Sequence, residues 1–176
     1  MSSLSSDSST PDRGRLPHHR EAPFQSPDPS TPAGEQILRR LREELFFWFT
    51  TVDATGAPHA LPAAFLWDEE HSTFLIYSAD EEDRDRLIQI QQNPKVGLHL
   101  NFDRIVADSF VLTGEAKVSL DDPSFDQVPA WVTKYQALFS QMGGLTIQQA
   151  AAVAPVALRV RPLTMIISYG GNIEEQ

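Results

Sequence analysis

Three segments with the composition of β-strands follow one another closely between residues 46 and 78. Their aromatic and β-branched side chains favour extended backbone, and they read FFWFTTV, PHALPAAFLW and STFLIYS. The turn between the first two contains Gly56, which can adopt the positive φ of a tight hairpin without strain. Because short turns join neighbouring antiparallel strands, this region predicts a three-stranded meander with strands at about 46–52, 58–67 and 72–78.

The rest of the chain adds helices and three more strands. A first helix is expected from Gly34 to the start of the first strand, because apolar residues recur there at helical spacing. Further helices are expected over 78–94, 123–140 and 146–153, and further strands over 95–102, 108–120 and 156–168. Ser78 and Glu81 have the spacing of a capping box, and Pro94 ends that helix. Six antiparallel strands with few helices predict a mainly β fold closed into a small barrel, because closure removes exposed edges.

Length and charge narrow the classes of function. The 176 residues suit one globular domain, which we place at 34–176, behind a flexible tail of Ser, Pro and charged residues at 1–33. A net charge of -10 disfavours binding to nucleic acid or to an anionic membrane. The lack of cysteine excludes disulfides and thiolate chemistry. The start of the chain has no apolar signal region and no apolar run could span a membrane, so we expect a soluble, cytoplasmic protein.

Two prolines interrupt the second strand. Pro58 and Pro62 cannot donate to a ladder of hydrogen bonds, so a central strand would not accept them. One explanation is that this strand lies at an opening of the barrel, where something other than a strand meets its backbone. The alternative is an ordinary edge strand that uses proline to prevent aggregation.

The common catalytic motifs are absent from the sequence. It has no Gly-rich phosphate loop, no G-x-S-x-G and no H-E-x-x-H, and its histidines lack the spacing of metal ligands, so no metal site is expected. The run DEEDRDR at 80–86 is either a solvated helix face or a place where Arg84 and Arg86 reach a bound phosphate with their fork-shaped guanidinium groups.

The order of these pieces resembles that of a known family. Residues 45–165 are similar to the pyridoxamine 5'-phosphate oxidase-like, FMN-binding split barrels, especially the branch that uses the deazaflavin coenzyme F420. The resemblance lies in FFWFTTVDATGAPHALPAAFLWDEEHSTFLIYS, NPKVGLHL and VLTGEAKVSLDD, and more loosely in VALRVRPLTM. It implies a six-stranded antiparallel split β-barrel and a homodimer. It also implies that FMN or coenzyme F420 lies in each groove between the subunits, where it exchanges a hydride with a small substrate.

The resemblance also assigns site residues. Arg86 stands where the family places a Lys or Arg on the cofactor phosphate, and Ser78 stands where relatives offer a hydroxyl. The strand that lines the cofactor ring corresponds to Pro62, Ala63, Ala64 and Phe65. WVTKYQALF resembles a helix with a Lys-Tyr pair in the deazaflavin branch, although Tyr135 also fits a core position.

Two functions remain open at this stage. The first is a flavin- or deazaflavin-dependent oxidoreductase, which needs no catalytic triad because the cofactor ring carries the redox chemistry. The second is a non-catalytic split-barrel dimer that binds flavin, haem or a tetrapyrrole, or that has lost its cofactor. The acidic residues at 80–85 favour the second function, because they would repel a cofactor phosphate.

Overall fold

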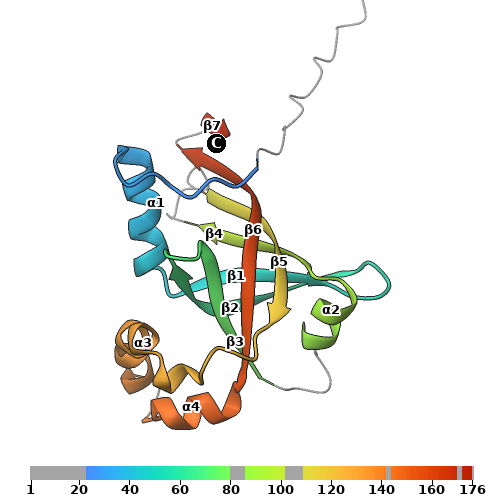
Figure 1. Ribbon diagram of the computed structural model, residues 1–176, viewed down its shortest axis with the longest axis vertical. Coiled ribbons are helices and arrows are strands. Elements are labelled where there is room, and N and C mark those ends of the chain that lie inside the picture. The colour runs from blue at the N-terminus through green and yellow to red at the C-terminus, as the bar shows by residue number, and fades with distance from the viewer. Residues whose placement is uncertain (1–22, 80–85, 102–108, 142–143, 170–171, 176) are drawn as a thin grey trace, which may run out of the picture.

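The computed structural model describes residues 23–79, 86–101, 109–141, 144–169 and 172–175. Its helices are α1 (Pro32–Glu43), α2 (Arg86–Gln92), the 3-10 helix η1 (Phe125–Gln127), α3 (Pro129–Gln141) and α4 (Ile147–Val153). Its strands are β1 (Phe46–Val52), β2 (Pro58–Asp68), β3 (Thr73–Ser78), β4 (Lys95–Asn101), β5 (Ser109–Val118), β6 (Val156–Tyr169) and β7 (Asn172–Glu175). Figure 1 shows the sheet with α1 on one side, α2 on the other, and α3 and α4 together at one end.

Six of the strands form a closed antiparallel barrel. They follow the order β3-β2-β1-β4-β5-β6, and β3 pairs with β6 to close the ring. This confirms the predicted mainly β, six-stranded split-barrel fold. The short β7 pairs with the last residues of β6 outside the ring and was not predicted.

Aromatic side chains fill the interior of the barrel. Phe47 and Phe49 on β1, Phe65 on β2 and Phe74 on β3 are almost completely buried. The rings of Phe47 and Phe65 stack with their centroids 4.5 Å apart. Because side chains alternate between the two faces of a strand, the even-numbered residues of β1 point outward. The interior is therefore a packed core, and any ligand site must lie at the barrel surface or at an end.

Two groups of helices cover the barrel. Helix α1 begins at an N-cap, since the Thr31 hydroxyl accepts a hydrogen bond from the Gly34 N–H, and it packs Ile37, Leu38 and Leu41 onto the core. Helices α3 and α4 pack against β3 in a second apolar cluster. Its buried members are Leu75, Tyr77, Phe125, Trp131, Tyr135, Ala150, Ala151 and Ala157. Among the described residues, no helix is long and apolar enough to cross a membrane.

The described part of the region expected to be a tail contacts the barrel. Pro23 forms an isolated bridge with Thr164 of β6, and the Phe24 N–H donates to the Leu163 carbonyl at 2.6 Å. The rings of Phe24 and Trp67 pack edge to face, with their centroids 6.1 Å apart. The expected boundary at residue 33 falls inside α1, which begins at Pro32 after the Thr31 cap. Phe24, ahead of this helix, is partly buried against the core. Residues 1–22 lie outside the described residues.

Two predicted helices differ from the observed ones. The helix expected over 123–140 is divided into η1 and α3, because Pro129 starts a new helix after Val128. The helix expected from Ser78 has its described part at α2, since residues 80–85 and the proposed capping residue Glu81 lie outside the described residues.

Candidate functional site

Strands β2 and β3 separate at one end of the barrel. β1 pairs with β2 over residues 58–64, whereas β3 pairs with β2 only from Phe65 to Asp68. The last residues of β3, Tyr77 and Ser78, pair with β6 on one side and have no pairing with β2 on the other. In the described part of the chain, residues 58–64 of β2 therefore have a strand neighbour on one side only. The split that the sequence predicted lies on the other side.

The two prolines face this open side. The backbone N–H and C=O of Phe65 both lie within hydrogen-bond distance of the Tyr135 hydroxyl, which also donates to the Leu45 carbonyl on the β1 side. The backbone groups of Phe65 therefore face β1. Backbone groups of successive residues in a strand face opposite sides. Counting back from Phe65, Pro62 and Pro58 face away from β1. Their missing N–H groups therefore remove no hydrogen bond from the β1–β2 ladder, which is the property expected at an opening.

A cavity of about 270 Å³ lies in the split, which we call the β2–β3 groove. Residues from β2, the end of β3 and the start of α2 line it: Leu61, Pro62, Ala63, Ala64, Tyr77, Ser78, Ala79 and Arg86. Five of the predicted cofactor residues thus meet here, namely Pro62, Ala63, Ala64, Ser78 and Arg86. The Phe65 ring is not among them, because it lies inside the barrel against Phe47. Arg84 lies outside the described residues.

Arg86 supplies the positive charge of the groove. It is the first residue of α2 and is partly buried, and its guanidinium carbon lies 5.7 Å from the centre of the Phe49 ring. A cation over an aromatic face is held by the ring quadrupole, so the side chain is oriented at the end of the barrel. A guanidinium group held in this way can bind a phosphate or carboxylate through two N–H groups at once.

The other walls of the groove are small or apolar. Ala63 and Ala64 leave the backbone of β2 accessible to a flat ligand. Ser78 is buried, and among the described residues its hydroxyl makes one long hydrogen bond, of 3.3 Å, to the Ala79 carbonyl. The Tyr77 hydroxyl donates to the Pro123 carbonyl at 2.7 Å, and burial raises the Tyr77 pKa to about 12. Tyr77 therefore only lines the groove, because its hydroxyl is already bound to Pro123. Ser78 and Arg86 are the polar side chains that can bind a ligand there.

The Lys-Tyr pair of α3 contacts the backbone of α1 and β2. Lys134 Nζ donates to the Leu41 carbonyl at 3.2 Å and to the Phe65 carbonyl at 3.0 Å, and it lies 4.0 Å from the centre of the Phe65 ring. Burial lowers the Lys134 pKa to about 8 and raises the Tyr135 pKa above its ordinary value. Sequence reasoning placed Tyr135 in the core but missed this contact between α3 and β2.

A partly buried ion network at the other end of β3 was also missed. Arg159 of β6 binds Asp122 through two hydrogen bonds of 2.8 and 2.5 Å, and it binds Asp68 at 2.6 Å. The hydrogen bonds from Arg159 hold the Asp122 pKa below its ordinary value. For Asp68, burial raises the pKa, but hydrogen bonds from Arg159 and His71 outweigh it, so the net shift is downward. No local pattern could show this network, because 91 positions separate Asp68 from Arg159.

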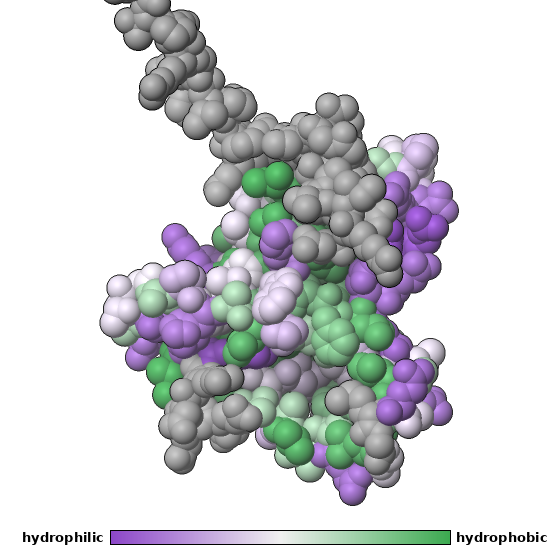
Figure 2. Space-filling view, turned by 180° about the vertical axis from the view of Figure 1, so that it is seen from behind, coloured by the Kyte–Doolittle hydropathy of each residue, from purple (hydrophilic) through white to green (hydrophobic). Residues whose placement is uncertain are grey.

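An exposed apolar face adjoins the groove. Phe46 and Trp48 on β1 are 47% and 50% exposed, and they stand opposite Ala64 and Pro62 of β2 in the strand register. In Figure 1, β6 crosses in front of β1 and β2, so Figure 2 looks onto the β1–β2 side. Hydrophobic side chains gather near the middle of that view, with hydrophilic ones at its left and right margins (Figure 2). Two large neighbouring aromatic side chains on a surface indicate a binding face.

Residues 33–164 match the family model described as pyridoxamine 5'-phosphate oxidase. Because this match covers most of the chain, the protein belongs to that family. No curated protein matches the chain.

Solved structures show the same fold. A putative pyridoxamine 5'-phosphate oxidase from Listeria innocua is 19% identical with a TM-score of 0.56, and the match covers 78% of this chain and 98% of that one. An F420 reductase is 20% identical with a TM-score of 0.55, covering 72% and 93%. HutZ, the heme storage protein from Vibrio cholerae, is 16% identical with a TM-score of 0.53, covering 76% and 94%. Identities this low support a shared fold and leave the activity open.

Proposed function

We propose that this protein is an oxidoreductase that binds FMN or coenzyme F420 in the β2–β3 groove and exchanges a hydride with a small substrate. The observation that carries the proposal is the convergence of Pro62, Ala63, Ala64, Ser78 and Arg86 on one cavity. These residues come from three separate elements. Family membership adds support, because flavin-type cofactors are usual in this family.

The groove has the chemistry that such a cofactor needs. The guanidinium group of Arg86 suits the phosphate, and the Ser78 hydroxyl lies in the same cavity as a second polar group. Pro62 and Ala64 present small, apolar side chains on one side of β2. A planar ring can therefore lie along this side, close to the backbone of the strand. When bound, the cofactor ring supplies the redox chemistry. The residues of this chain bind the phosphate, orient the ring and exclude water.

A second copy of the chain would complete the site. A cavity of about 270 Å³ is at the small end for a ligand site, and it opens next to the exposed Phe46 and Trp48. We therefore propose a homodimer in which these aromatic side chains are covered and each groove is closed by the partner. The expected cytoplasmic location also stays a prediction.

The cofactor test is direct. The protein is purified, its visible absorption and native mass are recorded, and the cofactor-free protein is titrated with FMN and with coenzyme F420 by fluorescence. We expect one of the two to bind at one molecule per subunit. If neither binds, the oxidoreductase proposal is wrong. Electron transfer from the reduced, bound cofactor to an artificial quinone acceptor then tests for catalysis, with free cofactor as the control.

A non-catalytic binder of haem or a tetrapyrrole is the second candidate. The fold is shared with HutZ, a heme storage protein, and His99 of β4 is exposed directly opposite Trp48 on the apolar face. An imidazole beside an open apolar surface could provide an axial ligand. Titration with haem distinguishes this candidate, because a ligated haem gives a shifted Soret band that His99→Ala would remove. A barrel that has lost its cofactor would bind none of the three.

A further inference from the structure

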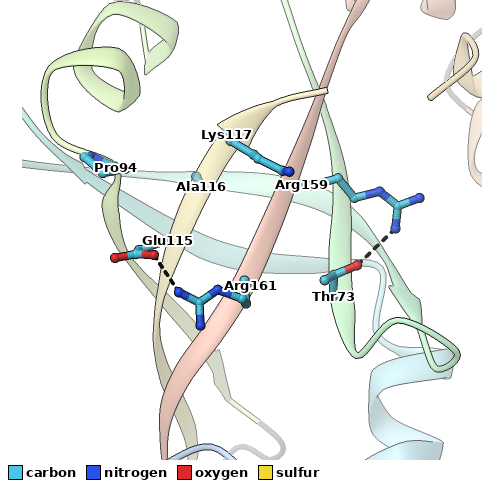
Figure 3. A pocket seen from close by; sticks show the side chains of 7 residues that line it. All are labelled: Thr73, Pro94, Glu115, Ala116, Lys117, Arg159 and Arg161. Carbon is cyan, nitrogen blue, oxygen red and sulfur yellow. Dashed lines mark hydrogen bonds and ion pairs between the residues drawn. The ribbon is translucent and has the colours of Figure 1, made fainter. Parts of the chain in front are cut away.

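A second cavity, lined by both charged and apolar groups, lies on the outer surface of β5 and β6. Its volume is about 330 Å³, and it is lined by Thr73, Pro94, Glu115, Ala116, Lys117, Arg159 and Arg161. Figure 3 shows Lys117 and Arg161 reaching over the same side of the two strands, with Lys117 directed toward β6 and Arg161 toward Glu115. We call this cavity the β5–β6 pocket. Thr73 and Ser78 are the two ends of β3, about 16 Å apart at 3.3 Å per residue, so the pocket is distinct from the β2–β3 groove.

The strand register concentrates positive charge in the β5–β6 pocket. Lys117 is directly opposite Arg159, and Glu115 is directly opposite Arg161. Like charges in directly opposed positions destabilise a sheet. The chain has 14 Lys and Arg residues against 24 Asp and Glu residues, and three of these cations line this one pocket. Local conflicts of this kind are expected at functional sites.

The partners of these cations differ. Asp68 and Asp122 compensate the charge of Arg159. Glu115 pairs with Arg161 at 2.7 Å, but the Arg161 side chain remains 64% exposed. Lys117 is exposed and has no ion pair with any carboxylate in the described parts of the chain. Lys117 and one side of the Arg161 guanidinium group are thus available to an anion.

We propose that the β5–β6 pocket binds a phosphate group, either inorganic phosphate or the phosphate of a small phosphomonoester. Lys117 and Arg161 are diagonal neighbours across two strands, a separation of about 7–8 Å between the residues. Their long side chains can both reach one phosphate, whose oxygens accept N–H bonds on several sides. Inorganic phosphate occupies only part of the cavity, so a small organic group fits beside it. This proposal does not depend on the proposed function.

The Glu115 carboxylate would repel a bound phosphate, and this repulsion provides a specific test of the proposal. Its carboxylate lies on the pocket wall and competes for Arg161. Removing its charge with Glu115→Gln should therefore strengthen phosphate binding, because repulsion is lost and Arg161 gains a free donor. If phosphate bound only through the general charge of the surface, removing any nearby carboxylate would change the affinity about as much as Glu115→Gln.

The test is a titration of ¹⁵N-labelled protein with inorganic phosphate, at an ionic strength held constant with sodium chloride. We expect saturable amide shifts at 115–117 and 159–161. The double variant Lys117→Ala with Arg161→Ala should weaken the affinity about tenfold or more, while Glu115→Gln should increase it. Lys95→Ala is the matched control, because Lys95 is opposite Glu115 on the neighbouring strand β4 but outside the pocket, and it should leave the affinity within about twofold.

Two results would overturn the proposal. One is the absence of saturable shifts on β5 and β6, and the other is an unchanged affinity in the double variant. Arg86→Glu separates this site from the β2–β3 groove: shifts at 115–117 should persist in that variant, whether or not FMN binding is lost. Failure at one site therefore leaves the result at the other intact.

Discussion

The hydroxyl oxygen of Tyr135 lies 2.8 Å from both the backbone nitrogen and the backbone oxygen of Phe65. It also lies 2.6 Å from the Leu45 carbonyl oxygen. Phe65 is the residue at which pairing with β3 begins, one position beyond the end of pairing with β1. One side chain of α3 therefore takes the place of pairing with β1 at the residue that follows the groove-lining part of β2.

We predict that Tyr135→Phe destabilises the protein by about 1–3 kcal/mol, because it leaves the buried Phe65 N–H and the partly buried Leu45 carbonyl without this hydrogen-bond partner. Urea unfolding measures the free energy of unfolding. Tyr77→Phe is the matched control, since its hydroxyl contacts the single carbonyl of Pro123, and it should cost about 0.5–1.5 kcal/mol. A cost for Tyr135→Phe no larger than that of Tyr77→Phe would contradict the role given to this hydroxyl.

The homodimer proposal predicts that Trp48→Glu produces a monomer. A carboxylate on the apolar face would be buried without a partner in the dimer, which is costly. Sedimentation velocity measures the oligomeric state. Leu120→Glu is the control, because Leu120 is the most exposed large apolar side chain in the described residues and does not line the groove. Dimers in both variants would show that Trp48 lies outside the interface, and a monomeric wild type would remove the proposal.

The strands were predictable because their signals are local. β1 occupies the expected residues 46–52, and Gly56 has a φ of 88° in the turn that follows. Exposed and buried side chains alternate along β1, so no distant contact is needed to read this pattern. The break at Pro129 also had a local signal, but the continuous helical spacing of apolar residues on both sides concealed it.

The candidate site was predictable only in part. The prolines of β2 indicated an opening, and the family resemblance indicated which residues would line it. The contact of Tyr135 with Phe65 joins residues 70 positions apart, and neither residue carries a sign of its partner. Phe65 was expected beside the cofactor, but the period of two along β2 turns its ring into the barrel, and Ala64 and Pro62 face the other way.

We predict that Arg86→Glu weakens the binding of FMN or coenzyme F420 by about tenfold or more, because attraction for the phosphate becomes repulsion. Fluorescence titration measures the affinity, and sedimentation shows whether the oligomeric state is retained. Arg39→Glu makes the same change of charge on the exposed face of α1, away from the groove, and should leave the affinity nearly unchanged. Equal affinities in both variants would exclude Arg86 from the cofactor site.

Lys134 predicts how stability depends on pH. Burial lowers the Lys134 pKa from 10.5 to about 8 in the folded protein. Between these two values the unfolded chain holds the proton and the folded chain releases it. The contribution of Lys134 to the free energy of unfolding therefore rises as the pH increases from about 8 to 10.5. In Lys134→Met this contribution is absent, so the wild type should gain stability relative to the variant across that range.

Urea unfolding of wild type and Lys134→Met at intervals from pH 8 to 10.5 tests this prediction. The quantity to follow is the difference between the two free energies of unfolding, because titration of other groups affects both proteins alike. Lys117→Met is the control, since it removes a lysine side chain that is exposed instead of buried. A difference for Lys134→Met that falls with rising pH would mean that the ammonium form is the one stabilised, through its hydrogen bonds to Leu41 and Phe65.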